Sequence, residues 1–414
     1  MADFHERTTC RMCEGGGLEK VMTLTATPPG NTLLRKEQLA TPETRYPLEL
    51  KFCNACGHVQ LGHVVDPRIL YQNDYLYVSG TSAQFVKHLR DYAAEMVRAL
   101  PLAKGALVAD IGSNDGTCLR GFQELSMKVI GVDPATDIAK AATTAGIETV
   151  ATFFSLEASR ELRAKYGPAA FITSHNACAH IDHLDDVVRG VAHWLADDGV
   201  FVLEVGYFVD VYSKLFFDTI YHEHLDYHTV APFEALFART GMQLIGAQRI
   251  APQGGSIRVM AQKSSGTRPR DRSVDELIGL ERQLGLNRAA TVAAFGDRIA
   301  AVGAELRTLL ASLKAQGKRI AAYGAPTKAV TLLSHFGIGV DTLDFVVEDN
   351  PMKHGLYLPV SHIPVVPTSE LYGRRPDYAL ILAWNFAEPI MNNHKRYAES
   401  GGRFIVPMPE PRIV

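Results

Sequence analysis

Two Cys-x-x-Cys pairs lie near the start of this 414-residue chain, and they constrain its fold more than any other feature. Cys10 and Cys13 form the first pair, and Cys53 and Cys56 form the second after 39 intervening residues. Each pair can present two thiolates from one tight turn, and two such turns complete a tetrahedral sulfur site. Four protein ligands leave no open coordination position, so we expect a structural zinc ion.

The cysteine-bearing segment, residues 1–70, is too small to form a large hydrophobic core alone, and a bound metal stabilises segments of this kind. The remaining length predicts two further domains. Hydrophobic residues make up 47% and charged residues 21%, as in soluble globular proteins. The net charge of −3 gives no electrostatic footprint for nucleic acid. With no export signal or membrane-spanning run, we expect a cytoplasmic protein without nucleic-acid or membrane partners.

Strand-like and helix-like patterns alternate after a predicted helix over residues 84–100. Short aliphatic runs at 106–112, 128–134, 148–154, 169–176 and 199–206 are separated by helical patterns, which predicts a doubly wound parallel sheet. Two helices are expected over 272–316, and the alternation then resumes. We therefore predict an α/β chain with a zinc module over 1–70, a Rossmann-like domain over 71–271, and a helical bridge with a smaller Rossmann-like domain over 272–414.

The turn after the first central strand carries the residues expected of a cofactor site. It reads Asp110-Ile111-Gly112-Ser113-Asn114-Asp115-Gly116, and Asp133 ends the next strand, where an acid can bind both ribose hydroxyls. NAD and S-adenosylmethionine (SAM) both fit this geometry. The NAD fingerprint requires a glycine where Asn114 stands, and Asp110 repels a pyrophosphate but suits the ammonium group of SAM. The turn resembles motif I of class I SAM methyltransferases, (D/E)xGxGxG, with Asn114 as the departure.

We therefore favour SAM, with an NAD-dependent oxidoreductase acting on a nucleotide sugar as the alternative. The expected cofactor-binding residues are Asp110, Gly112, Ser113, Asn114, Gly116, Asp133, Phe153 beside the adenine, and Asn176 in the cleft. A third possibility is a non-catalytic zinc-binding partner module.

The whole chain resembles the nucleotide-sugar C-methyltransferases of antibiotic deoxysugar pathways. Besides the cysteine pairs and the Asp110–Gly116 turn, the matching motifs are Tyr71-x-x-x-Tyr75-x-Tyr77-x-Ser79-Gly80, His175-Asn176-x-x-x-His180, Glu204-Val205-Gly206-Tyr207, Phe217-Asp218-Thr219-Ile220-Tyr221-His222-Glu223-His224 and Tyr323-Gly324-Ala325-x-x-Lys328. The eight residues from Phe217 to His224 are the most specific of these. The resemblance implies SAM-dependent methylation of a nucleotide-diphosphate 4-keto-deoxysugar, often thymidine-linked, at C-3.

Methylation of carbon requires a base that removes a proton and donors that stabilise the resulting enolate. A neutral histidine can act as this base at pH 7. By resemblance we expect His224 as the base, with Tyr75, Tyr221 or His180 as enolate donors and Glu223 holding a sugar hydroxyl or orienting a histidine.

Other interpretations of the same cluster stay open. His222 and His224 could hold a metal, the Tyr221–His224 segment could be a polar contact between domains, and the tyrosines could serve packing alone. The cluster could equally deprotonate a hydroxyl, which would make the protein an O- or N-methyltransferase.

The smaller domain begins with a strand followed by Tyr323-Gly324-Ala325-Pro326-Thr327-Lys328 at the start of a helix. Free amides at a helix start, together with a lysine, suit a phosphate group. We expect half of a nucleotide-diphosphate site here; the alternative is a domain that serves only as a scaffold. The expected substrate contacts are Tyr75, Asn176, Tyr221, Glu223, Gly324, Thr327 and Lys328.

Overall fold

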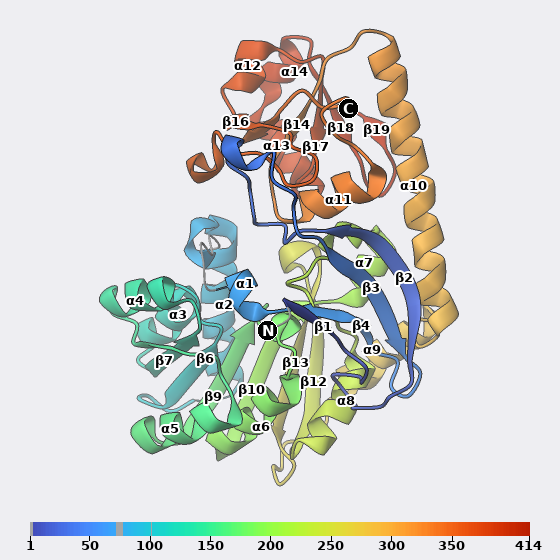
Figure 1. The fold of residues 1–414 in the computed structure, drawn as a ribbon. Helices are drawn as coiled ribbons and strands as arrows, with labels where there is room; N and C mark the ends of the chain where they lie inside the picture. The colour runs from blue at the N-terminus through green and yellow to red at the C-terminus, as the bar shows by residue number, and fades with distance from the viewer. Residues whose placement is uncertain (1–2, 72–77, 101) are drawn as a thin grey trace.

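The computed structural model describes residues 3–71, 78–100 and 102–414, which form three parts (Figure 1). In the first part, a four-stranded antiparallel sheet has the order β11-β4-β3-β2. Its strands are β2 (Leu18–Thr27), β3 (Tyr46–Cys53), β4 (Val59–Leu61) and β11 (Asp226–Tyr227), and a separate pair joins β1 (Phe4–Glu6) to β5 (His63–Val65). Because β11 comes from the middle of the chain, the zinc module is docked on the central domain by shared strand pairing.

The central part is a seven-stranded sheet with the order β12-β13-β10-β9-β6-β7-β8. Its strands are β6 (Leu107–Ile111), β7 (Lys128–Asp133), β8 (Thr149–Ala151), β9 (Ala169–His175), β10 (Leu195–Gly206), β12 (Met242–Ile250) and β13 (Ser256–Lys263). β6 to β10 are parallel, and β13 runs antiparallel to both of its neighbours. The strand order reverses between β6 and β9, and ligands of such sheets bind at the carboxyl ends beside this reversal.

Helices cover both faces of the central sheet. They are α2 (Ala83–Ala99), α3 (Thr117–Glu124), α4 (Thr136–Thr144), α5 (Leu156–Tyr166), α6 (Leu184–Trp194), α7 (Phe208–Lys214) and α8 (Val230–Arg239), while the short α1 (Pro67–Tyr71) ends the zinc module. In α2, Phe85, Leu89, Tyr92 and Met96 recur at helical spacing and are buried. The Ser82 side chain caps this helix by accepting a hydrogen bond from the Phe85 amide.

The C-terminal part is a six-stranded sheet with the order β16-β15-β14-β17-β18-β19, parallel except for β19. Its strands are β14 (Ile320–Tyr323), β15 (Val346–Glu348), β16 (Val365–Pro367), β17 (Tyr378–Ile381), β18 (Arg403–Val406) and β19 (Arg412–Ile413). Its helices are α11 (Lys328–Phe336), α12 (Glu370–Arg374), α13 (Ala387–Asn393) and α14 (Lys395–Glu399).

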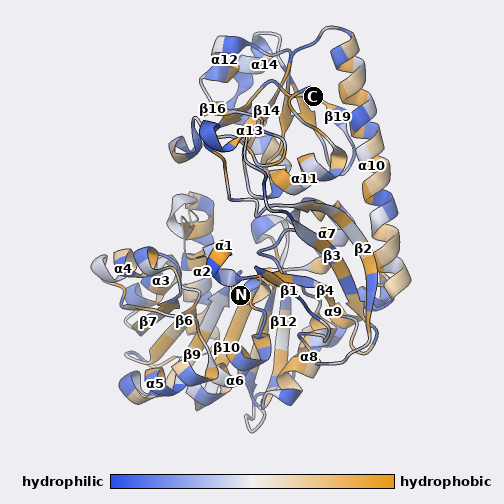
Figure 2. Cartoon of the chain, in the orientation of Figure 1, coloured by the Kyte–Doolittle hydropathy of each residue, from blue (hydrophilic) through white to orange (hydrophobic). Residues whose placement is uncertain are grey.

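Two helices link the central and C-terminal parts: α9 (Arg272–Gln283), which packs on β12, and the long α10 (Ala289–Ala315). α10 contacts β2 and β3 of the zinc module and α11 of the C-terminal part (Figure 1). Its buried side chains include Val292, Phe295, Ile299 and Leu306. Hydrophobic residues concentrate in the strands of both α/β sheets (Figure 2). The zinc module, the bridge and the C-terminal domain therefore share packing surfaces.

The predicted α/β class, with an N-terminal zinc-binding module, a central Rossmann-like domain of class I methyltransferase topology and a smaller C-terminal Rossmann-like domain, is confirmed. The sequence patterns did not reveal the antiparallel pair β12 and β13 that completes the central sheet, nor the two-residue β11. None of the described helices is both long and apolar enough to cross a membrane.

Candidate functional site

The four N-terminal cysteines come together in the zinc module. Sγ of Cys10 lies 3.6 Å from Sγ of Cys56, and Sγ of Cys13 lies 3.5 Å from Sγ of Cys53. All four sulfur atoms lie within 4.8 Å of one another. Tetrahedral Zn–S bonds of about 2.3 Å place the sulfurs at such separations. The four thiolates therefore fit a closed, structural zinc site.

The turn after β6 has the shape expected of a cofactor loop. Gly112 and Gly116 have φ of +73° and +77°, and Asn114 has φ of +51°, a conformation that asparagine tolerates better than most residues. A Cβ added at Gly112 would collide with Ala177 of the neighbouring loop. Asp133, at the end of β7, accepts hydrogen bonds from the amides of Asn114 at 2.8 Å and Ala135 at 2.9 Å. The hydrogen bond from Asn114 to Asp133 therefore joins the carboxyl ends of strands β6 and β7.

Several buried polar atoms of this turn and of the neighbouring end of β9 have no hydrogen-bond partner among the described residues: Asp110 Oδ1, Ser113 Oγ and both ring nitrogens of His175. Burial raises the pKa of Asp110 well above its usual range, and the nearby Asp133 raises it further. A buried carboxyl in this state is stabilised by a cation. The ammonium and ribose of SAM provide the complementary groups, so the residues present fit this cofactor.

Asn176 begins a loop that leads from the cofactor turn to the predicted catalytic histidines. Its φ is +59°, and its amide donates to the Glu204 carbonyl at 2.7 Å. The loop passes Ala177, which contacts Gly112, and reaches His180. The His180 ring stacks on Tyr71 at 6.1 Å and lies 5.0 Å from the His224 ring, between centroids. The cofactor turn and His224 are therefore connected through one short loop.

His224 has a defined hydrogen-bonding arrangement. Its Nδ1 lies 2.8 Å from the Thr219 carbonyl oxygen, and its Nε2 lies 2.9 Å from the Tyr221 hydroxyl. Burial lowers the pKa of His224 to about 4, although the Thr219 carbonyl opposes this shift. Burial, together with the neighbouring His224, lowers the pKa of His180 to about 3. Both imidazoles are therefore neutral at pH 7.

Glu223 lies where the three parts of the chain meet. Asn31, in the loop after β2, donates from Nδ2 to Glu223 Oε1 at 3.0 Å and accepts from Thr327 Oγ1 at 2.5 Å. A Cβ added at Gly30 would lie 2.5 Å from the Thr327 carbonyl oxygen. Burial raises the pKa of Glu223 to about 7, with the Asn31 hydrogen bond opposing this shift. Its carboxyl group is therefore partly protonated near neutrality.

His222 points away from this cluster, although it is two residues from His224. It is buried against the Tyr46 ring, with Nε2 lying 3.2 Å from the Tyr46 carbonyl oxygen. Within residues 3–71, 78–100 and 102–414, neither histidine belongs to a group of potential metal ligands. His222 therefore packs at the contact with the zinc module, whereas His224 lies beside His180 and Tyr221.

Lys328 is buried at the start of α11. Its Nζ lies 3.3 Å from Asp218 Oδ2 and 4.6 Å from the centre of the Trp384 ring, while Trp384 Nε1 donates to the same Asp218 oxygen at 2.7 Å. Gly324, with φ of +86°, opens the turn after β14. A phosphate role for Lys328 requires that it exchange Asp218 for the ligand.

Two other predicted residues remain, Tyr75 and Phe153. Tyr75 lies outside the described residues. Phe153 follows β8 and is 44% exposed, whereas its neighbour Phe154 is buried against Trp194. Phe153 is therefore exposed at the end of β8, and its predicted place beside the adenine stays a prediction.

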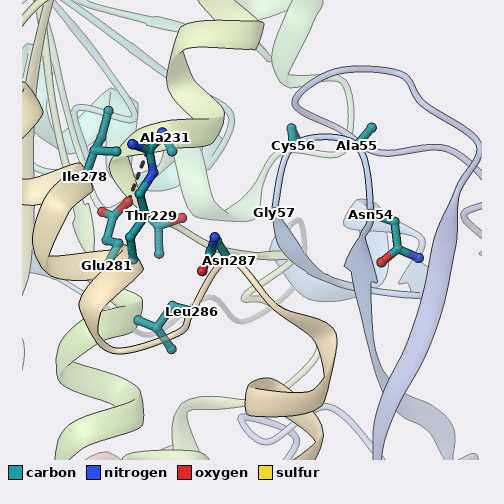
Figure 3. A pocket seen from close by; sticks show the side chains of 11 residues that line it. Asn54, Ala55, Cys56, Gly57, Thr229, Ala231, Ile278, Glu281, Leu286 and Asn287 are labelled. Atoms are coloured by element: carbon teal, nitrogen blue, oxygen red, sulfur yellow. Dashed lines mark hydrogen bonds between the residues drawn. The ribbon is translucent and has the colours of Figure 1, made fainter.

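A hollow of about 250 Å³ lies beside the second zinc knuckle, and no histidine lines it (Figure 3). Cys56 and Gly57 line one side, and Glu281 lines the other. Glu281 accepts hydrogen bonds from the amides of Val230 at 2.6 Å and Ala231 at 3.3 Å. The Glu281 side chain therefore caps the start of α8.

Sequence reasoning missed Asn31, which joins Glu223 to the C-terminal domain, and Arg11, which joins the first zinc knuckle to Asp182 and Leu225 of the central domain. The signals were a polar residue after the Pro28-Pro29-Gly30 turn and a charged residue inside a zinc knuckle.

Three family models match consecutive parts of the chain: a "zinc binding domain" over residues 10–71, a "Methyltransferase domain" over 85–246 and a "C-methyltransferase C-terminal domain" over 251–409. The C-methyltransferase NovU of Streptomyces niveus is 36% identical over 405 residues, covering 98% of this chain and 96% of that protein. Among solved structures, a SAM-dependent methyltransferase from Clostridium acetobutylicum is 12% identical with a TM-score of 0.34, covering 44% of this chain and 92% of its own. Magnesium protoporphyrin IX methyltransferase from Synechocystis is 14% identical with a TM-score of 0.33, covering 48% and 89%.

Proposed function

The chain belongs to the C-methyltransferase family, and from that premise we propose that it methylates C-3 of a nucleotide-diphosphate 4-keto-deoxysugar, with a thymidine-linked sugar as the first candidate. It is a SAM-dependent methyltransferase whose N-terminal module binds a structural zinc ion. Family membership argues against the NAD-dependent alternative. Action in the cytoplasm remains a prediction.

The observation that carries the substrate proposal is the arrangement of His224. A carbonyl oxygen only accepts hydrogen bonds, so Nδ1 facing Thr219 carries the proton and Nε2 carries the lone pair. This lone pair can take the C-3 proton of a 4-keto sugar, with the C–H electrons passing into the enolate. A bound base of this kind contributes about 10²–10⁴-fold in rate.

The low pKa of His224 makes enolate stabilisation essential. A base with a pKa of about 4 removes a carbon-bound proton only if the ketone oxygen is strongly polarised. The Tyr221 hydroxyl, with Tyr75 as a second candidate, is proposed to donate to that oxygen. His180 is proposed to donate through a ring N–H from the opposite loop. Asn176 is proposed to line the same space.

When bound, SAM would supply an electrophilic methyl group to the enolate carbon, with its sulfur as the leaving atom. Asp110 is proposed to receive the ammonium group of SAM, and Asp133 is proposed to bind the ribose hydroxyls. Gly112, Ser113, Asn114 and Gly116 are proposed to shape the turn around it, with Phe153 beside the adenine.

The nucleotide is proposed to lie toward the C-terminal domain, where Asn31 links Glu223 to Thr327. Glu223 then holds a sugar hydroxyl on one side of this junction. On the other side, the Gly324 amide donates to the Val347 carbonyl, the Ala325 amide donates to Glu348 Oε2, and Pro326 has no amide hydrogen, so the Thr327 amide is the one proposed to face the diphosphate. Lys328 joins this amide if it releases Asp218.

The test is incubation of the purified protein with SAM and a panel of nucleotide-linked 4-keto-deoxysugars, followed by mass spectrometry and NMR. We expect a gain of one methyl group on carbon, with loss of the C-3 proton signal. A second measurement omits methyl transfer: in D2O with S-adenosylhomocysteine, wild type should exchange the C-3 proton for deuterium. A methyl signal on oxygen or nitrogen, without exchange at C-3, would favour the O- or N-methyltransferase alternative.

A further inference from the structure

Arg11 lies inside the first zinc knuckle, between the ligands Cys10 and Cys13, but its side chain contacts the methyltransferase domain. The residue is 1% exposed. Its Nε donates to Asp182 Oδ1 at 3.0 Å, and one terminal nitrogen donates to the Leu225 carbonyl at 3.3 Å. A charged side chain this deeply buried requires partners of this kind.

These two contacts fall on the two loops that carry the predicted catalytic histidines. Asp182 is two residues after His180, and Leu225 directly follows His224. The two loops are themselves joined, because the Leu225 amide donates to the Ala179 carbonyl at 2.8 Å. Arg11 therefore holds both loops from one side chain.

The same terminal nitrogen of Arg11 also donates to the Leu61 carbonyl at 3.0 Å, and the Arg11 amide donates to Gln60 Oε1 at 2.9 Å. Leu61 in turn donates its amide to the Leu225 carbonyl at 2.8 Å. Both Gln60 and Leu61 belong to β4 of the zinc module. The hydrogen bonds to Gln60 and Leu61 therefore hold Arg11 on the zinc module, and the same side chain also contacts the two histidine loops.

We propose that Arg11 is a positioning residue for methyl transfer, through which the first zinc knuckle sets the spacing of His180 and His224. The proposal rests on the proposed function, in which these two histidines act on the substrate. The planar guanidinium donates in two directions from a rigid frame, which a lysine ammonium on a flexible stem does not reproduce. The flanking zinc ligands restrict the backbone from which that frame extends.

A purely structural role for Arg11 predicts a different pattern, and Arg239 separates the two. Arg239 on α8 donates from Nε to the Met12 carbonyl at 2.9 Å and from a terminal nitrogen to the Arg11 carbonyl at 3.2 Å. It therefore anchors the same knuckle with a similar number of hydrogen bonds. Its other partners are Glu14 and Asp185, outside both histidine loops.

The experiment compares full-length wild type, Arg11→Lys and Arg239→Lys, each loaded with zinc. Zinc content, SAM affinity by calorimetry and the thermal midpoint are measured beside kcat and KM on the best sugar substrate. For Arg11→Lys we expect one zinc per chain, SAM affinity within about twofold and kcat lowered by about 10²-fold, the scale of a displaced catalytic group. Arg239→Lys should keep kcat within about threefold of wild type, within the spread of a typical lost hydrogen bond.

Histidine NMR provides a readout that needs no turnover. His180→Asn and His224→Asn identify the two imidazole signals, and we expect both signals to move in Arg11→Lys and to stay in Arg239→Lys. If the wild type methylates no sugar, the proposed function fails, whereas the NMR comparison still tests Arg11. Unchanged signals in Arg11→Lys, or equal changes in both arginine variants, would overturn the proposal. If Arg11→Lys does not fold, Arg11→Gln is judged by the same criteria.

Discussion

The Tyr221 hydroxyl lies 2.9 Å from Nε2 of His224, on the ring edge opposite the nitrogen held by the Thr219 carbonyl. Because that carbonyl fixes the proton on Nδ1, the phenol is the donor to Nε2. The resting protein thus keeps its proposed base neutral, oriented and already hydrogen-bonded. A substrate must displace the Tyr221 hydroxyl from Nε2, which frees the phenol to donate to the substrate's ketone oxygen.

Replacing His224 with Asn should nearly abolish methyl transfer, because the amide cannot accept the carbon-bound proton. We expect a loss of about 10²–10⁴-fold in kcat, the range for a missing general base. SAM affinity, measured by calorimetry, should stay near wild type.

His222→Gln is the matched control, since His222 faces Tyr46 in the zinc module. It should keep most of the wild-type kcat. Retained turnover in His224→Asn, or an equal loss in both variants, would rule out His224 as the base.

Tyr221→Phe keeps the ring and removes the hydroxyl that contacts His224. If the hydroxyl also polarises the ketone, kcat should fall by about 10²–10³-fold, as when one oxyanion donor is lost. Wild-type exchange of the C-3 proton in D2O, measured by NMR, should slow in parallel, because enolate formation itself is impaired. Slower methyl transfer with unchanged exchange would place Tyr221 outside enolate formation.

The sequence predicted the elements that repeat a local pattern. The four cysteines and the strands that carry Asp110 and Asp133 follow from spacing and hydrophobic runs alone. In contrast, β11 is only two residues long, Asp226 and Tyr227, and carries no periodic signal. Its pairing with β4 depends on the docking of two domains, which no local pattern encodes.

The candidate site was likewise predicted only in part. The sequence spacing grouped His222 with His224, whereas in the structure His222 contacts Tyr46 of the zinc module and His224 faces His180. Asn31 and Arg11 were missed because their partners lie far away in the chain: Glu223 and Thr327 for Asn31, and Asp182 and Leu225 for Arg11. Contacts of this range follow from tertiary packing.

Asn114, the departure from the motif I glycine, should contribute to SAM binding. Its Oδ1 accepts a hydrogen bond from the Ser79 amide at 2.9 Å, which ties the segment before α2 to the cofactor turn. Asn114→Gly loses this bond but suits the φ of +51°, so SAM affinity should fall about fivefold, equivalent to about 1 kcal/mol. Asn114→Ala loses the bond and strains the turn, so it should bind more weakly still. Calorimetry that shows tighter binding in Asn114→Gly would contradict this role.

Loss of zinc should unfold more than its own module. Structural Zn²⁺ sites contribute about 10–16 kcal/mol of apparent binding energy in small peptides, and here the knuckle also holds Arg11 against the central domain. Cys53→Ser should therefore bind less than one zinc per chain and show a lower thermal midpoint. Cys118→Ser, at a buried cysteine of α3 outside the zinc site, is the control and should keep its zinc. Full stability in metal-free Cys53→Ser would contradict a structural role.

The buried histidines should destabilise the folded protein as the pH falls from about 6.5 to 4. Burial lowers the pKa of His222 and His224 to about 4 and that of His180 to about 3, so the unfolded chain binds protons in this window that the folded chain does not. Each such histidine lowers the free energy of unfolding by about 1.4 kcal/mol per pH unit as the pH falls. Glu223, whose pKa is raised to about 7, acts in the opposite direction between about pH 7 and 4.5, because the folded state then binds the extra proton. Asp110, Asp133, Asp218 and Glu281, whose pKa values burial also raises, act in the same direction as Glu223, whereas His175 and His228, with pKa values lowered to about 4 and about 3, act with the three histidines. The contribution of one histidine is therefore measured as the difference between wild type and a histidine variant in denaturant melts at pH 6.0 and 5.0. The slope in His222→Gln should be smaller by about 1.4 kcal/mol per pH unit, because one titrating group is gone; an unchanged slope would mean that His222 is not held neutral by burial.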